Sequence, residues 1–356
     1  MKHISQLTLL TALGFALTTS LLPQEAFANE VQTGTVLAPV LKIENFIGKV
    51  TINNAETLSM TGQAPDTLRQ DARKLVIDGG EKFSNVNCRK TSAKISLAIG
   101  KKKWIGRSAG YKDLDQYPHL KVTVPENAKL IIKNSIVFGQ SQTLGAADIN
   151  VRSCGDLELG DITGPLDLKV NGSSNFQADN VGNADITITG SGDAQIAQAA
   201  NVTVKVSGSG DIRLDDVQSL KARLTGAGDL QVGDVTDGFH VATSGSSDVK
   251  AKDINGTVDI SGNGSSSVKT GSVHGNASIK LSGSGDVNIP RGEISHLNVY
   301  TTGSSDVRFN GVAHTAELEA YGSSDIHIKK ITGTYKANSS RSADIHVAKK
   351  VTIDFD

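Results

Sequence analysis

Aromatic side chains are scarce in this 356-residue chain, at 4% of the residues with a single tryptophan. A core this short of aromatic rings has to be thin and filled by valine, isoleucine and leucine. The chain also has no excess of either charge, since its formal net charge is −1. A balanced charge gives no electrostatic reason to expect binding to nucleic acid or to an anionic membrane. We therefore expect no nucleic-acid partner.

Long apolar runs are absent after residue 22. Before it, Lys2 and His3 open the chain, an apolar run extends from Leu7 to Leu22, and small residues follow in Ala26-Phe27-Ala28. This order is typical of a cleaved export signal, which we assign to residues 1–28. The run is short and interrupted by threonines, which argues against a retained anchor. We expect an exported mature chain with no transmembrane segment, located in the periplasm, on the outer-membrane surface or in the medium.

Cysteine is nearly absent, with only Cys88 and Cys154. Two cysteines are too few for a structural zinc site. In an oxidising compartment they can form a disulfide that ties the N-terminal region to the first clear repeat. Two separate thiols are the alternative that the sequence leaves open.

Glycine, in contrast, is abundant, with 37 residues, many of them in one repeated motif. The motif reads glycine, small residue, glycine or serine, aspartate, and an alternating apolar segment follows it. We call the aspartate position the anchor; successive anchors are 18 to 20 residues apart. The anchors are Asp156, Asn175, Asp193, Asp211, Asp229, Asp248, Ser267, Asp286, Asp306, Asp325 and Asp344. A fixed period this short, in strand-like sequence, predicts the stacked coils of a solenoid.

Apolar and polar residues alternate on both sides of each anchor. The first and third residues after it are apolar in nearly every copy, as in Ile212 and Leu214, and a second apolar pair precedes the turn. This period of two indicates strands with one face in the core. A third apolar point lies about six residues after the anchor in several copies, at Val217, Val235, Ile254, Val273, Val312 and Ile331. The sequence therefore predicts an all-β fold: a parallel β-solenoid, or β-helix, of 18–20-residue coils, with right-handed crossovers as the default.

The N-terminal part keeps the alternation but loses the period. We interpret residues 29–125 as an irregular β region that caps the solenoid, and residues 126–356 as the solenoid itself. Within it, Val137 lies 19 residues before Asp156 and indicates a degenerate first coil. The basic run 101–107, beside the only tryptophan, is predicted to be a solvated loop; contact with phosphate or sugar is the alternative.

With its export signal, the strand ending in Val122-Thr123-Val124-Pro125 and the reiterated Gly-Ser-Gly-Asp and Gly-Ser-Ser-Asp turns, the chain resembles the head GIN domain family. The resemblance covers about residues 38–351. It implies a β-solenoid and an adhesin-like role, and it carries no shared catalytic residues. The family is described as auto-transporter adhesins, but this sequence ends at Asp356, twelve residues after the last anchor, so we expect no auto-transporter barrel.

The aspartate column is the strongest candidate site. Stacked about 4.8 Å apart, neighbouring carboxylates repel each other by roughly 0.9 kcal/mol in water, so something has to compensate. Acceptance of backbone N–H bonds in the turn is one explanation, and Asn175 and Ser267 fit it because both can make such bonds. Calcium bound between coils is the alternative, and no other cofactor is expected.

Two other columns are candidates for binding. His327 and His346 occupy the same outward position in successive coils and could hold a transition metal or sense low pH. Six residues before each anchor lies a polar column whose members include Lys205, Arg223, Lys280 and Tyr300. This column suits an extended ligand such as a glycan or an envelope protein. For both columns, an ordinary solvated strand face is the alternative.

No catalytic pattern is evident: the chain has neither a Ser-His-Asp arrangement, nor a phosphate-binding glycine loop, nor metal-ligand spacing. We therefore expect a non-enzymatic binding or adhesion module of the cell envelope or surface. The alternatives are a polysaccharide-acting β-helix enzyme and a structural periplasmic protein without a ligand.

Overall fold

The structure is a computed structural model that describes residues 38–62, 67–71, 73–81, 86–91, 94–99 and 110–350. The chain divides into two units, Met1–Leu37 and Ala38–Asp356. The predicted export signal and the basic run 101–107 lie outside the described residues. Within the ranges that the structure describes, no helix is both long and apolar enough to span a bilayer.

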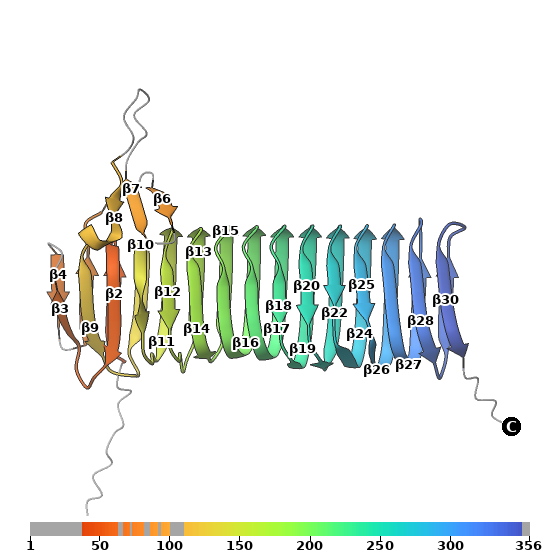
Figure 1. Cartoon of the computed structure of the whole chain (residues 1–356). Helices are drawn as coiled ribbons and strands as arrows, with labels where there is room; N and C mark the ends of the chain where they lie inside the picture. Colours follow the sequence, from red (N-terminus) through yellow and green to blue (C-terminus); the bar gives the residue numbers. More distant parts are fainter. Residues whose placement is uncertain are drawn as a thin grey trace, which may run out of the picture. The chain divides into compact units, whose positions relative to one another are not determined.

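The second unit is built almost entirely of strands, which stack side by side (Figure 1). The first are β1 (Val40–Glu44), β2 (Ile47–Asn54), β3 (Ser59–Gly62), β4 (Thr67–Gln70), β5 (Lys74–Asp78), β6 (Val86–Lys90), β7 (Ile95–Ile99), β8 (Lys112–Asp113), β9 (His119–Val124), β10 (Lys129–Ser141), β11 (Ala146–Ser153), β12 (Asp156–Leu159), β13 (Leu166–Gly172), β14 (Asn175–Val181) and β15 (Ala184–Gly190). A short 3₁₀ helix, η1 (Leu114–Gln116), separates β8 from β9.

The remaining strands continue the stack with the same spacing. They are β16 (Ala194–Gly208), β17 (Ile212–Gly226), β18 (Leu230–Val232), β19 (Val235–Gly245), β20 (Asp248–Ala251), β21 (Ile254–Asn255), β22 (Thr257–Gly264), β23 (Ser267–Lys269), β24 (Ser272–Gly283), β25 (Asp286–Ile289), β26 (Arg291–Gly303), β27 (Asp306–Ala320), β28 (Asp325–Ile331), β29 (Tyr335–Ser339) and β30 (Asp344–Lys350).

Consecutive coils pair in parallel. In β16 and β17, for example, the register runs from Ala194 opposite Ile212 to Gly208 opposite Gly226. In each coil, we call the strand segment that begins at the anchor the anchor segment. We call the strand segment that leads up to the next glycine-containing motif turn the return segment. The predicted parallel β-solenoid is confirmed, with about 12 turns at a spacing of about 19 residues.

The first glycine of each motif turn forms a column of its own. Gly190, Gly208, Gly226 and Gly245 all have φ between +123° and +135°, which L side chains rarely adopt. A Cβ atom at Gly226 would also overlap the carbonyl oxygen of Gly208 in the coil beneath it. Glycine recurs at this position because the turns stack at backbone contact distance.

The core is a single apolar strip that extends through the stack. The predicted inward residues on both sides of the anchors are buried in nearly every coil, and phenylalanines such as Phe176 and Phe309 are among the largest fully buried side chains. The prediction that Val312 faces the core is wrong, since Ala313 is buried in its place. The reason is an extra residue in β27 after Phe309, which shifts the register between β27 and β28. The core remains continuous across this irregularity.

The stack begins earlier than the sequence period indicates. Strands β1 and β2 both pair with β10 in parallel. On its other edge β1 pairs in parallel with β5, and β2 pairs in parallel with β9. Phe138, and not Val137, lies opposite Asp156, because the first coils are offset by one residue. Two antiparallel strands, β3 on β9 and β4 on β5, complete this end. Antiparallel edges of this kind protect the open end of a solenoid.

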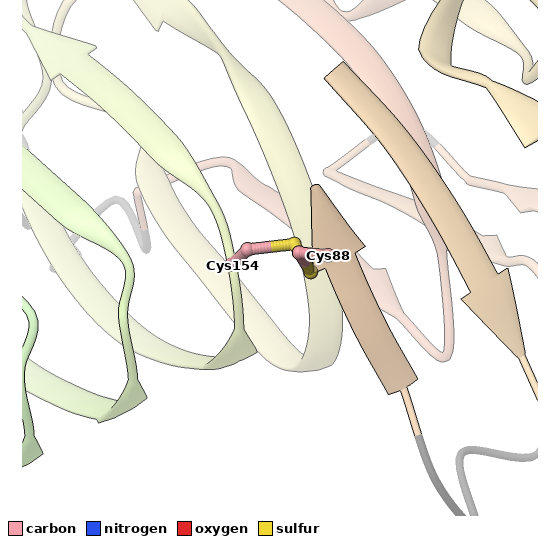
Figure 2. Close-up of a disulfide and its surroundings, with 2 residues drawn as sticks. All are labelled: Cys88 and Cys154. Atoms are coloured by element: carbon pink, nitrogen blue, oxygen red, sulfur yellow. A yellow bond between two sulfur atoms is a disulfide. The ribbon is translucent and has the colours of Figure 1, made fainter. Parts of the chain in front are cut away.

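Strands β6, β7 and β8 form a separate antiparallel sheet, which we call the mini-sheet. Cys88 on β6 is bonded to Cys154, which lies between β11 and β12 (Figure 2). Leu97 and Leu114 pack with Ile136 and Phe138 of the first coils in a second apolar cluster. The mini-sheet is therefore attached to the solenoid by a covalent bond and by apolar packing.

The last described coil differs from the coils before it at one core position. Lys350 occupies the register position of Ile331, which is buried in the core of the preceding coil. Its ammonium nitrogen lies 4.9 Å from the ring centroid of Tyr335, which is half-buried against the last core residues. A charge at this position disfavours the packing of another apolar coil on the last described one.

We predict that Lys350→Ile makes the chain self-associate, because it extends the apolar strip to the edge of the last described coil. Sedimentation velocity over a range of concentrations measures this. Lys349→Ile removes the same charge from the adjacent exposed position and should leave the sedimentation coefficient unchanged. Equal behaviour of the two variants would contradict the assignment of Lys350 as a cap.

Candidate functional site: the ladders of the anchor segment

The outward residues of the anchor segments form two parallel columns, which together we call the anchor face. The first column contains the anchors themselves, as the register of Asp286 with Asp306 and of Asp306 with Asp325 shows. The second column contains the residues two positions further on, such as Lys250 opposite Lys269 and Arg308 opposite His327. Each coil from Asp156 to His346 therefore contributes two polar side chains to one face.

Three anchor carboxylates accept hydrogen bonds from the backbone of the next coil. The Asp211 N–H donates to Oδ1 of Asp193 (3.0 Å), the Asp229 N–H to Asp211 (2.9 Å) and the Asp248 N–H to Asp229 (3.0 Å). These carboxylates thus connect adjacent coils and do not close their own turns. The bonds compensate part of the repulsion within the column.

The first N–H group after each column glycine also bonds to the preceding coil. Ser191, Ser209 and Ala227, which follow the column glycines, donate to the glycine carbonyl of the preceding coil at 2.8–2.9 Å. The N–H groups of the turn and of the anchor residues therefore both donate to the preceding coil.

A further acidic ladder, not predicted from the sequence, lies five residues after the anchors. The Asp234 N–H donates to Oδ1 of Asp216 (2.9 Å), and the Asp253 N–H donates to Asp234 (3.1 Å). Hydrogen bonding by Ser272 lowers the pKa of Asp253, and Arg291 lowers it further. The spacing of these aspartates equals that of the anchors, so the same periodicity search would have found them.

The two columns of the anchor face line a shallow groove. One part, of about 460 Å³, extends from Asn175 to Lys250, and a second, of about 330 Å³, extends from Ser267 to His346. From Asp156 to His346 the columns contain nine aspartates and Glu158, against the basic residues Arg213, Lys250, Lys269 and Arg308. Their formal charge is therefore −6, whereas the whole chain has −1.

The groove's character changes beside the mini-sheet. In the first coils the anchor column continues as Phe138, Lys49 and His119, and a cleft of about 750 Å³ lies between them and the mini-sheet. Lys90 of β6 forms an ion pair with Asp156 (3.0 Å), and Lys49 pairs with Asp115. The cleft therefore has a wall on the mini-sheet in addition to its floor on the solenoid.

The two histidines stack, as their shared outward position predicted. The ring centroids of His327 and His346 are 4.7 Å apart. In the part of the chain that the structure describes, no group of three or more His, Cys, Asp or Glu side chains is placed to hold a metal ion.

The column predicted to bind a ligand lies on the return segments. Lys205 is opposite Arg223, and Lys280 is opposite Tyr300. Ala242 and Ser261 separate the two pairs, so the four residues do not form one continuous charged stripe. They lie on a different strand segment from the groove.

We predict that Asp211→Ala lowers the free energy of unfolding by about 0.5–2 kcal/mol, because the Asp229 N–H loses its acceptor. Asp211→Asn keeps an acceptor oxygen and should differ from the parent by less than about 0.5 kcal/mol. Urea unfolding measures both. Calcium ligation predicts the contrary: added calcium would raise the melting temperature and a chelator would lower it.

Comparison with known families gives one match. The profile of the auto-transporter adhesin, head GIN domain, family matches residues 67–234 and 248–355. Comparison with curated proteins and with solved structures gave no match. The matched ranges include most of the stacked coils and the turn motif that repeats through them. The chain belongs to the head GIN domain family.

Proposed function

We propose that this chain is an exported, non-enzymatic binding module that holds an extended glycan along the groove of the anchor face. The observation that carries the proposal is the repetition of the groove, since each coil adds one anchor side chain and one second-column side chain. A ligand that lies along the stack meets similar partners at each rung, about 4.8 Å apart. An extended pyranose chain advances by a comparable length per sugar.

The side chains of the groove suit a glycan better than a peptide. Amides, carboxylates and guanidinium groups such as those of Gln195, Asp211 and Arg213 offer planar arrays of donors and acceptors for sugar hydroxyls. Peptide recognition in a groove usually needs apolar pockets for side chains. Here the outward residues are polar and the apolar ones face the core.

The charge of the groove narrows the class of glycan. A formal charge of −6 in the two columns favours neutral or amine-bearing sugars and repels sulfated or uronic-acid polymers and nucleic acid. The proposed location in the cell envelope or outside the cell rests on the N-terminal export pattern. The Cys88–Cys154 disulfide fits an oxidising compartment of this kind.

Calorimetry with three probes tests the proposal: the glucosamine hexamer, the N-acetylglucosamine hexamer and heparin. We expect the amine-bearing hexamer to bind most tightly, with an affinity that falls as salt is added, and heparin not to bind. Tight binding of heparin, binding of neither hexamer, or release of shorter products would overturn the proposal.

Matched variants locate the site. Asp211→Asn combined with Asp229→Asn removes two charges from the groove and keeps the acceptors between coils. The affinity for the glucosamine hexamer should then fall several-fold. Asp185→Asn combined with Asp259→Asn removes two exposed charges from the return segments and should leave the affinity unchanged. Equal losses in both double variants would argue against the groove.

A further inference from the structure

Tyr300, on the return segment of β26, and Tyr321, directly after β27, lie side by side near the C-terminal end of the described stack. The ring centroids of Tyr300 and Tyr321 are 5.8 Å apart, with an angle of 52° between the ring planes. Tyr300 is 40% exposed, one of three large hydrophobic side chains exposed to this degree among the described residues. Neither ring belongs to the core, so core packing does not explain their proximity.

The tyrosine pair is surrounded by hydrogen-bonding side chains. The Tyr321 hydroxyl donates to Oε2 of Glu319 (3.3 Å) and accepts from Nδ2 of Asn338 (3.1 Å). Burial raises the pKa of Tyr321, and the negative charge of Glu319 raises it further. The hydroxyl therefore stays protonated and is held in place.

The register places opposite charges on the two sides of Tyr300. Lys280 lies opposite it in the preceding coil and Glu319 in the next coil. An aromatic face with a cation, a carboxylate and an amide at its border matches the chemistry of a sugar ring. The C–H face of a pyranose packs on an aromatic ring, while its hydroxyls bond to charged and amide groups.

We propose that Tyr300 and Tyr321, with Lys280, Glu319 and Asn338, form a binding site for one or two pyranose rings of a neutral glycan. The site goes beyond the groove of the anchor face, because it lies on the return segments and does not share residues with the groove. The compensated charges of Lys280 and Glu319 favour a neutral sugar. Stacking on Tyr300 supplies the main contact, and the fixed Tyr321 hydroxyl orients the ring.

The test is titration of the whole protein with maltotriose, cellotriose and the N-acetylglucosamine trimer, followed by nuclear magnetic resonance. At least one of these neutral trisaccharides should bind, and Tyr300→Ala should weaken that binding about ten-fold, as expected for a lost aromatic stack. Tyr300→Phe keeps the ring and should stay within about two-fold of the parent.

Tyr111→Ala is the matched control, since Tyr111 is 43% exposed and precedes β8 of the mini-sheet. It should bind the trisaccharide like the parent. The Asp211→Asn, Asp229→Asn double variant should also keep this binding, which separates the tyrosine site from the groove. Binding of none of the three trisaccharides, or equal binding by Tyr300→Ala and the parent, would overturn the proposal.

Discussion

Close backbone stacking of one turn on the next is the constraint on which the rest of this structure depends. The column glycines adopt positive φ values and lie against the glycine carbonyl of the coil beneath, where a Cβ atom would not fit. Backbone N–H groups such as that of Ser209 bond across the same step. This contact repeats from Gly172 to Gly322 and fixes the register of the motif turns, whereas extra residues between the turns shift the register locally.

This stacking converts a repeated sequence into straight columns of side chains. A residue type that recurs at one position of the motif becomes a ladder, whether buried, like Ile212 and Leu230, or outward, like the anchor aspartates. The groove's charge is a consequence, since the anchor position is acidic in most coils. The tyrosine pair shows the complementary case, in which two successive coils each carry a side chain that differs from the rest of its column. We propose that the ladders bind extended polymers and that such departures bind individual sugars.

Much of the fold could be predicted from the sequence, because the motif recurs at a nearly constant spacing that can be read directly. The inward residues, the parallel stack and the anchor column follow from periods of two and about nineteen. Local irregularities could not be predicted: Ala313 replaces Val312 in the core only because β27 carries an extra residue. The direction of the carboxylate bonds and the placement of the mini-sheet beside the groove depend on neighbouring coils. The Tyr300–Tyr321 contact joins adjacent columns, so a search along one column misses it.

The stability of Gly226→Ala tests the central claim most directly, with Ala227→Ser as its control at the adjacent exposed position of the same turn. If turns stack at backbone contact, the added methyl group meets the Gly208 carbonyl at an unfavourable φ, and the free energy of unfolding should fall by about 2 kcal/mol or more. Ala227→Ser should stay within about 0.5 kcal/mol of the parent. Equal stability of Gly226→Ala and the parent in urea unfolding would contradict the account.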